Sequence, residues 1–559
     1  MPSFTTLVQH PGDDDNLAWI KLLLAGLALF ALLYEASSER EGNPISLRWK
    51  KAAGLVFGVL GVLAYFQFFD IGYKDFYHRH ELFHYYVGAK YFPELGYEGI
   101  YACTAAAEAE LPIGSAGPRD VPARAVRLRK LRDLRKNSIA DTTEWVDDPT
   151  RCTGGDAGEG RRAFSPERWA AFKADIAFFR RVSFAGPYWN GMQTDHGYNP
   201  PPVWGLLGRF FADLHPADVT TMKLLASIDP LLMAATFGMI AWAFGWRVLC
   251  VALLFFGTQD ASPFYWTGGA FLRQDWLFFT IGSACLLRKG KPFWSGVFLA
   301  YGTMLRVFPV FFFAGWIVVA AAHAYRKIVV EKTPLSFSWA TLRDLTPPRL
   351  RSVAAGAAVG ALVLFAATIP VTGLASWRTF VHHIAVHNDT ALTNHMGWKT
   401  IVSHRAEGRM QITEDPRLAD HFQTWKAMRT ERKRTSRIAL WGGTGLLLGA
   451  FVLACWRLKT LWIVEALGCL PATVLIELTD YYYSFFLFAA LLSRGRRTVE
   501  IALVVASIAS EWCHLYYRFF DDRFVAMSVV FLVLAAFLVA LHLRPPRWRG
   551  ATGATVPAR

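Results

Sequence analysis

Long apolar runs recur along most of this chain of 559 residues, and short connectors rich in arginine and lysine separate many of them. A run of roughly 17 to 20 apolar residues can cross the hydrocarbon core of a bilayer as a helix. Short loops enriched in Lys and Arg mark the cytoplasmic face of a membrane protein. The pattern therefore predicts an all-α polytopic membrane protein, with a single integral membrane domain over residues 1–559 and its large loops outside the cytoplasm. The clearest basic connectors are residues 37–51, 288–291, 326–351, 456–459, 493–497 and 544–549.

The apolar runs predict about thirteen transmembrane helices, with the N-terminus outside and the C-terminus in the cytoplasm. The runs on either side of Arg306 lie between two basic connectors, so we expect the chain to turn near Arg306 and Pro309. That turn would lie deep in the membrane or at its far side. The expected spans, of which the shortest should extend further, are 17–34, 52–69, 222–244, 246–257, 271–287, 293–305, 308–322, 353–371, 438–455, 461–478, 485–492, 501–511 and 524–541.

The composition agrees with a membrane protein and argues against a nucleic-acid partner. Hydrophobic residues make up 53% of the chain, which favours one helical membrane domain over several soluble ones. Much of the net charge of +15 lies beside the apolar runs, so we interpret it as a topological signal. The first run lacks a basic leader and a small-residue cleavage site, so we expect it to remain as a span. A bacterial inner (plasma) membrane is the favoured location, although the sequon Asn388-Asp389-Thr390 does not decide this.

Two long segments without membrane-length apolar runs are expected outside the cytoplasm, at residues 70–220 and 375–437. In the first loop, residues 166–181 alternate apolar and charged side chains at helical spacing. This suits a helix lying flat on the membrane, or equally a packed helix of a small soluble subdomain. Residues 203–214 are too short to span and predict a re-entrant or interfacial helix. An oxidising compartment would permit a disulfide between Cys103 and Cys152 of the same loop.

Acids, histidines and aromatic residues are crowded at the outer end of the second predicted span. Aromatic belts with solvated charges are common at membrane borders, which gives a purely structural interpretation. A carboxylate at the boundary between lipid and water could instead serve as a general base for a hydroxyl nucleophile. The candidates for that base are Asp70, Asp75 and Glu81.

Two arginines are candidates for phosphate recognition, because a guanidinium group can bind a phosphate through a bidentate fork. Arg273 opens a predicted span on the outer side, and Arg306 lies in the turn described above. The alternative for Arg306 is a structural role in which it pairs with an acid. If the carboxylates and the arginines share one cavity, the natural substrate is a lipid-anchored phosphate.

The second external loop contains a cluster of histidine and amide side chains. Imidazole is a good ligand for transition metals, but this loop has no tight zinc motif, so hydrogen bonding to a sugar or phosphate is favoured and no metal or other cofactor is expected. Phosphate-binding glycine loops and a nucleophile elbow are also absent, which argues against nucleotide chemistry in the cytosol. The cluster consists of His382, His383, His387, Asn388, Asn394, His395, Gly397, Trp398 and Lys399.

Several short motifs between residues 55 and 500 resemble those of the C-type polytopic glycosyltransferases. The likeness is to glycosyltransferase family 87, the polyprenol-phosphate-mannose-dependent mannosyltransferases. Glu81 stands where family members commonly have Asp, and Arg306 stands where they often have Lys. The insertion that holds Cys103 and Cys152 has no counterpart that we recognise. The motifs are Glu81 with Tyr85, Tyr86, Gly88, Ala89, Gly96 and Tyr101; Tyr198-Asn199-Pro200-Pro201-Pro202; Gly269 to Gln274; and Gly296 to Pro309.

This resemblance implies an inverting transfer, in which a carboxylate deprotonates the acceptor hydroxyl while a polyprenyl phosphate leaves the anomeric carbon. We therefore expect a membrane glycosyltransferase that moves mannose, or another hexose or pentose, to an envelope glycan or glycolipid. A transporter or flippase for a lipid-linked or anionic solute is the main alternative, and a noncatalytic assembly subunit is a third. The expected roles are catalysis by Glu81, Asp75 or Asp70; donor phosphate binding by Arg306, Arg273 and Lys399; and substrate binding by His84, Tyr85, Tyr198, Gln274, Asn394 and His395.

Overall fold

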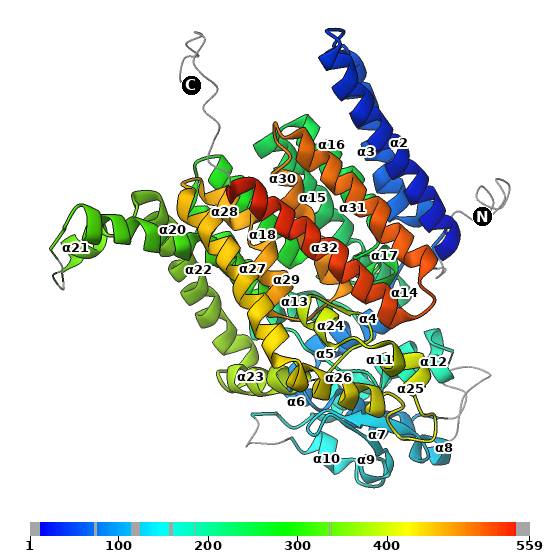
Figure 1. The fold of residues 1–559 in the computed structure, drawn as a ribbon. Helices are drawn as coiled ribbons and strands as arrows, with labels where there is room; N and C mark the ends of the chain where they lie inside the picture. The colour runs from blue at the N-terminus through cyan, green and yellow to red at the C-terminus, as the bar shows by residue number, and fades with distance from the viewer. Residues whose placement is uncertain are drawn as a thin grey trace.

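The computed structural model describes residues 12–71, 75–112, 123–155, 160–184, 186–334, 336, 338–388 and 390–543. The predicted basic connector 544–549 lies outside them. The described chain is mainly helical, and its strands form only two short antiparallel pairs. Figure 1 shows a bundle of long helices with a layer of shorter helices from the two large loops at one end.

Seven helical segments in the described chain are long and apolar enough to cross a membrane. Each of them contains one of the predicted spans, so the chain is an integral membrane protein. The number of spans beyond these seven stays a prediction. The seven are α2 (Asp14–Arg40), α14 with α15 (Val219–Phe244), η3 to η4 (Phe308–Val330), α22 (Pro348–Thr372), α27 (Arg437–Arg457), α31 (Arg497–Tyr516) and α32 (Phe520–Leu543).

The other six predicted runs lie on helices that are shorter or more basic. The run 485–492 was expected to extend, but the structure has only a 3-10 helix and a five-residue α-helix there, both buried by neighbouring helices. These elements are α3 (Leu47–Tyr65), α16 (Trp246–Thr258), α18 (Asp275–Arg288), α19 (Pro292–Leu305), α28 (Leu461–Ala466) with α29 (Cys469–Leu475), and η6 (Asp480–Phe486) with α30 (Leu487–Leu491).

The first two helices attach to the bundle at separate faces. A glycine contact joins α3 to α16, where a Cβ atom on Gly257 would lie 1.9 Å from the carbonyl oxygen of Gly61. Small residues of this kind allow helices in a membrane to approach closely. Helix α2 packs on α31, and there Lys21 Nζ lies 3.4 Å from Glu511 Oε1. Both side chains are almost fully buried, at 4% and 0% exposed.

The basic connectors meet at the end of the bundle away from the loop layer. Glu39 pairs with Lys50 at 2.6 Å and with Arg497 at 3.0 Å, which joins two of the connectors. Arg496 contacts the ring of His542, and Arg457 donates to the carbonyl oxygen of Leu543. Three predicted cytoplasmic connectors and the end of α32 therefore share one side of the molecule, as the pattern of positive charge requires.

The first loop folds into a packed subdomain rather than a set of surface helices. Helix α11 (Pro166–Val182) buries Trp169, Phe172, Ile176 and Phe179, so the alternative of a packed helix is the correct one. A disulfide joins Cys103 of α7 (Ile100–Ala109) to Cys152 of α10 (Thr150–Thr153), as the sequence permitted. The loop also contains the hairpin β1 (Lys130–Asp133) and β2 (Ser138–Asp141), and the short helices α8 (Ala123–Arg127), α9 (Thr143–Asp147), α12 (Pro187–Met192) and α13 (Pro202–Asp213).

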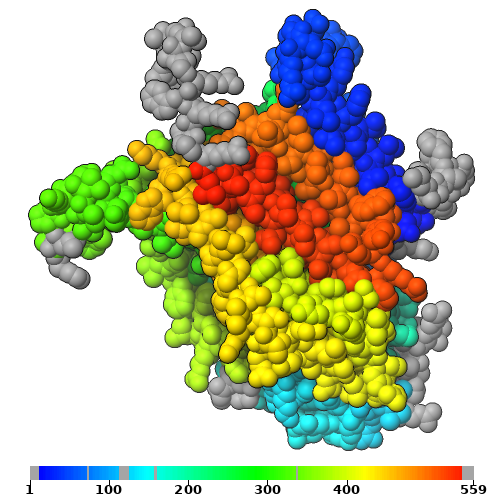
Figure 2. All heavy atoms as spheres, in the orientation of Figure 1, coloured from blue at the N-terminus to red at the C-terminus, as the bar shows by residue number. Residues whose placement is uncertain are grey.

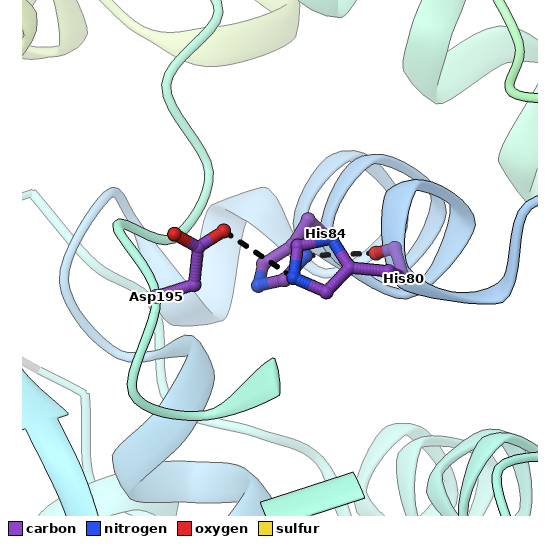
Figure 3. A group of neighbouring side chains, drawn as sticks. All are labelled: His80, His84 and Asp195. Carbon is purple, nitrogen blue, oxygen red and sulfur yellow. Dashed lines mark hydrogen bonds and ion pairs between the residues drawn. The ribbon is translucent and has the colours of Figure 1, made fainter. Parts of the chain in front are cut away.

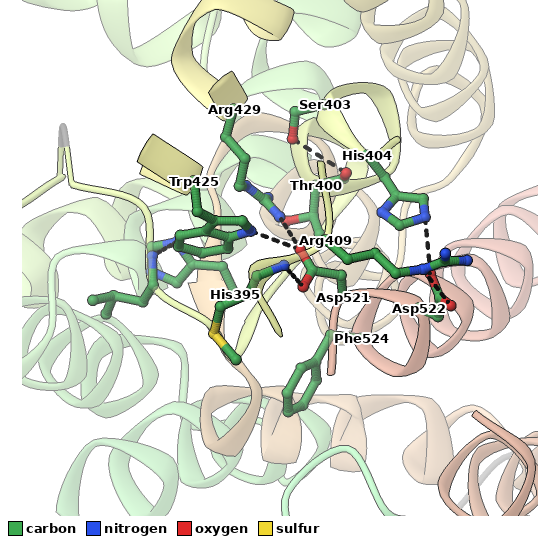
Figure 4. Close-up of polar contacts among 12 residues, drawn as sticks. His395, Thr400, Ser403, His404, Arg409, Trp425, Arg429, Asp521, Asp522 and Phe524 are labelled. Atoms are coloured by element: carbon green, nitrogen blue, oxygen red, sulfur yellow. Dashed lines mark hydrogen bonds and ion pairs between the residues drawn. The ribbon is translucent and has the colours of Figure 1, made fainter. Parts of the chain in front are cut away.

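The second loop lies between the first loop and the start of α32, to which it is fixed (Figures 1 and 2). Asp521 accepts hydrogen bonds from the Trp425 indole and from the backbone of Met410, while Asp522 pairs with Arg409 and His404 (Figure 4). The elements involved are α24 (Trp398–Ser403), η5 (Ala406–Gly408), α25 (Met410–Thr413) and α26 (Gln423–Thr435), which follow α23 (Ala375–Asn388).

A two-residue strand pair brings the second loop to the segment before η6. His395 of β3 (His395–Met396) is opposite Thr479 of β4 (Leu478–Thr479). The next residue, Gly397, has a φ of +128°, and a Cβ atom there would lie 2.8 Å from the carbonyl oxygen of Thr473. Only glycine fits this approach without strain. The pair places the histidine cluster beside the tyrosines of η6.

Candidate functional site

One of the predicted acids and one of the predicted arginines are in direct contact. Arg273 Nε lies 2.9 Å from Glu81 Oε2, and Arg273 Nη1 donates to the Tyr85 hydroxyl. The guanidinium carbon also lies 4.4 Å from the centroid of the Tyr85 ring. Glu81 is in the first turn of α4 (Arg79–Leu82), where its N–H donates to the ring of the capping residue His78. The contact joins residues 192 positions apart, since 273 minus 81 is 192.

The position of Arg273 is set by an acid at the beginning of α15. The N–H groups of Arg273 and Gln274 donate to the Asp229 carboxylate over 3.0 to 3.1 Å. The preceding residue, Leu272, has a φ of +52°, and its carbonyl oxygen accepts from the Trp204 indole. A non-glycine residue in this conformation is held there by its surroundings. The Asp229 carboxylate therefore fixes the backbone of Arg273, whose exposed fraction is 4%.

Arg306 is the C-terminal cap of α19 and is buried. Nη1 donates to the carbonyl oxygen of Leu305, while Nε and Nη2 have no hydrogen-bond partner in the described chain. No salt bridge to Arg306 occurs among the described residues, but the Asp275 carboxylate attracts the guanidinium group at longer range. A buried guanidinium group with free donors is costly unless an anion completes its hydrogen bonds. The turn itself is where the sequence predicted it, between α19 and η3 (Phe308–Phe313).

Two neighbouring cavities surround these charges. The smaller, of about 170 Å³, has Arg306, Tyr85 and Tyr482 in its wall together with apolar side chains such as Val307 and Ile384. The larger, of about 580 Å³, has Glu81, Asp195 and Lys426 in its wall together with aromatic side chains such as Trp266 and Trp425. Leu392, Thr479 and Tyr481 line both cavities and form the wall between them.

No family model matches this chain, and no curated protein or solved structure matches it either. The interpretation of the site therefore rests on its own geometry.

The structure brings only one of the three candidate bases to the cavities. Asp75 pairs with Arg79 and Lys223 at 3.6 and 3.5 Å and lines neither cavity. Asp70 is exposed, accepts a hydrogen bond from the backbone of Gly12, and also lines neither cavity. The cavities therefore favour Glu81 among the three candidates, and the assignment of the base stays a prediction.

The predicted ligand residues divide between the cavity walls and the layer behind them. Tyr85 and His395 line the smaller cavity, and Asn394 lines the larger. Lys399 and Arg273 line neither, so their assignments to the donor phosphate stay predictions. His84, Tyr198 and Gln274 are buried without lining either cavity, and they support the wall residues instead.

Several wall residues had not been expected from the sequence. Glu477 lines the smaller cavity and pairs with Arg429 at 3.3 Å and with Lys433. Burial raises the pKa of Glu477, but the two cations outweigh it and lower the pKa to about 2. The run Asp480-Tyr481-Tyr482-Tyr483 contributes Tyr481 to the wall that both cavities share. This polar and aromatic run between two apolar runs was a usable sequence signal for a functional site.

A second overlooked signal is His80-Glu81-Leu82-Phe83-His84, which has the order H-E-x-x-H. On a helix this order places two histidines one turn apart with a glutamate beside them. Asp195 also lies next to these histidines and lines the larger cavity.

Proposed function

We propose that this chain is a membrane glycosyltransferase, which transfers a sugar from a polyprenyl-phosphate donor to a glycan or glycolipid acceptor. The observation that carries the proposal is the placement of charge at the shared wall. The Glu81 carboxylate lines the larger cavity and is held from behind by Arg273, and the buried Arg306 offers free donors to the smaller cavity. In this proposal the bundle is a C-type fold of about thirteen spans in a bacterial inner membrane. Its loop layer lies on the non-cytoplasmic side.

The smaller cavity suits the donor. A phosphate in contact with Arg306 would satisfy the nitrogens that lack a partner in the described chain, and a guanidinium group binds phosphate strongly. Val307, Phe308 and Ile384 in the same wall offer apolar contacts to the first part of a polyprenyl chain. Because Arg306 directly precedes the segment Phe308–Val330, which is long enough to span, a donor can approach from within the bilayer.

The larger cavity suits the hydroxylated acceptor, because its wall offers polar groups such as Asn394, Thr393 and Lys426. In the reaction, the acceptor oxygen forms a bond to the anomeric carbon as the bond from that carbon to the phosphate oxygen breaks. The electron pair leaves with the polyprenyl phosphate, and the hydroxyl proton passes to Glu81. Arg273 and Arg306 stabilise the charge that develops on the phosphate. The transferred sugar, mannose or another hexose or pentose, changes its anomeric configuration.

The test is sugar transfer by the purified full chain in liposomes, with a labelled polyprenyl-phosphate sugar and a glycolipid extract as acceptor. We expect Glu81→Gln to lower the rate by about 100-fold or more, as loss of a general base does. Asp75→Asn is the matched control, because Asp75 is an acid of the same segment outside both cavities, and its rate should stay within about twofold of the wild type. Thermal unfolding of each variant separates lost catalysis from lost folding.

A rate for Glu81→Gln equal to that of the control, in a folded protein, would overturn the assignment. Arg306→Lys keeps the charge and should retain more activity than Arg306→Gln, which removes it. Equal loss in both variants would argue against phosphate binding at Arg306.

A transporter or flippase for a lipid-linked or anionic solute is the second candidate. The buried pair of Lys21 and Glu511 favours it, because ionisable residues inside spans are typical of ion and substrate pathways. Counterflow of a labelled solute in liposomes without any new glycosidic product would support transport over transfer.

A further inference from the structure

Three potential metal ligands converge beside the larger cavity: His80, His84 and Asp195 (Figure 3). Their nearest ligand atoms all lie within 4.8 Å of one another. The two histidines come from the helical segment α4 to η2 (Phe83–Val87), and Asp195 comes from the loop between α12 and α13. His80 Nε2 is 3.4 Å from Asp195 Oδ2. Two ligands on one tetrahedral zinc ion, each about 2.1 Å from the metal, are about 3.4 Å apart. This pair therefore already has the spacing of a coordinated pair.

The surroundings of His84 fix which of its ring nitrogens is available. Nδ1 lies 2.8 Å from the carbonyl oxygen of His80, and a carbonyl can only accept, so Nδ1 carries the proton. Nε2 then carries the lone pair and accepts from the Tyr101 hydroxyl at the shorter distance of 2.7 Å, while the carbonyl oxygen of Met192 lies further away, at 3.2 Å. The Tyr101 oxygen in turn accepts from the backbone N–H of Gly197. A histidine that donates through Nδ1 to a backbone carbonyl has the orientation common among metal ligands.

The ligand types also suit coordination. Imidazole nitrogen and carboxylate oxygen are both common ligands of divalent transition metals.

The site is open on one side. His80 and Asp195 line the larger cavity, whereas His84 lies behind them and is only 2% exposed. Three protein ligands with a free position toward a cavity are the arrangement of catalytic rather than structural zinc sites. Glu81 lies between the two histidines in sequence and lines the same cavity. In the H-E-x-x-H order this glutamate acts as a base on an oxygen bound to the metal.

We infer that His80, His84 and Asp195 form a three-ligand site for a divalent transition metal such as Zn²⁺, with its open position facing the larger cavity. This departs from the sequence-based expectation that the protein uses no metal. Binding by two nitrogens and one carboxylate oxygen favours Zn²⁺ or Co²⁺ over Mg²⁺ or Ca²⁺, which prefer all-oxygen sites. On binding, His84 Nε2 exchanges its hydrogen bond from Tyr101 for the metal. The inference does not depend on sugar transfer, because binding is measured without a donor or acceptor.

The test uses the purified full chain in detergent, stripped with a chelator and then titrated with Co²⁺ and, in competition with a chromogenic chelator, with Zn²⁺. We expect one metal per chain and the visible absorption of cobalt in a low-coordinate site. Asp195→Asn should weaken Zn²⁺ binding by at least tenfold, and His84→Gln should abolish it. His421→Ala is the control, because His421 is exposed and lies outside the cavity, and it should bind as the wild type does.

Substitution of the buried His84 can also disturb folding, whereas the Asp195 side chain is 43% exposed and tolerates replacement. Asp195→Asn and His80→Gln therefore decide the result if His84→Gln does not fold. Failure of the wild type to bind Co²⁺ or Zn²⁺ would overturn the inference. Equal binding by the wild type, Asp195→Asn and His80→Gln would overturn it as well, because the metal would then be held elsewhere.

Discussion

Replacing Lys21 by methionine should destabilise the membrane domain, because it leaves the Glu511 carboxyl buried between α2 and α31 without its charged partner. At the observed separation of 3.4 Å, two unit charges interact by about 5 kcal/mol if the effective dielectric constant is about 20. Removal of one partner from a buried pair costs about 3 to 5 kcal/mol in proteins. Methionine keeps most of the volume of lysine, so the cost reflects charge rather than a cavity. We therefore expect Lys21→Met to lower the free energy of unfolding by about 3 to 5 kcal/mol.

The double variant Lys21→Met/Glu511→Gln separates pairing from packing, because it removes both charges. It should recover to within about 1 kcal/mol of the wild type, since replacing a whole buried pair is often neutral. The measurement is SDS-induced unfolding in mixed micelles, followed by tryptophan fluorescence. Lys223→Met is the control, because Lys223 is 49% exposed and pairs with Asp75 at the surface, where pairs contribute about 0 to 1 kcal/mol. The reasoning is refuted if Lys21→Met costs no more than this control. It is also refuted if the cost of the double variant equals the sum of the costs of Lys21→Met and Glu511→Gln measured singly.

Three further predictions concern the loop layer and its support. The double variant Cys103→Ala/Cys152→Ala lacks the disulfide, and its free energy of unfolding in urea should be lower than that of the wild type by about 4 kcal/mol. This is the chain-entropy value for a sequence separation of 49 residues. An unchanged midpoint of urea unfolding would contradict this prediction. Asp229→Asn should lower the free energy of SDS-induced unfolding by about 2 kcal/mol, because the new amide nitrogen would face the N–H of Arg273. Asp218→Asn is the control, and it should lower this free energy by less because Asp218 is at an exposed helix cap. Burial lowers the pKa of His383 from 6.5 to about 3, so the unfolded chain binds a proton that the folded chain excludes between these values. Stability should therefore fall as the pH drops below 6.5, by up to about 1.4 kcal/mol per pH unit from this residue, and His383→Gln should flatten the slope of unfolding free energy against pH.

The long spans were predictable because length and hydropathy leave few alternatives in a bilayer. Helix α22 is a continuous apolar stretch, and the sequence places it nearly to its ends. Helices α18 and α19 have only 14 residues each, so their length alone does not show whether they cross the membrane. The packed helix α11 was ambiguous for a different reason. An apolar stripe at helical spacing is the same whether it faces lipid or protein, and only the rest of the subdomain decides.

The candidate site was predictable in its parts but not in its assembly. The sequence identified Glu81, Arg273 and Arg306, yet the contact of Glu81 with Arg273 depends on Asp229, which no local pattern connects with either residue. The acids Asp70 and Asp75 carry the same chemistry as Glu81, and a sequence does not show which of three neighbouring carboxylates faces a cavity. The histidines at 80 and 84 were visible in the sequence. Their partner Asp195 was not, because it approaches from a separate loop more than a hundred residues later.

Leu392, Thr479 and Tyr481 each line both cavities. A group in one cavity therefore lies a single side chain away from a group in the other. Tyr481 has the largest side chain of the three, so a smaller residue at position 481 would bring the two occupants closer without any change to the charged residues around them.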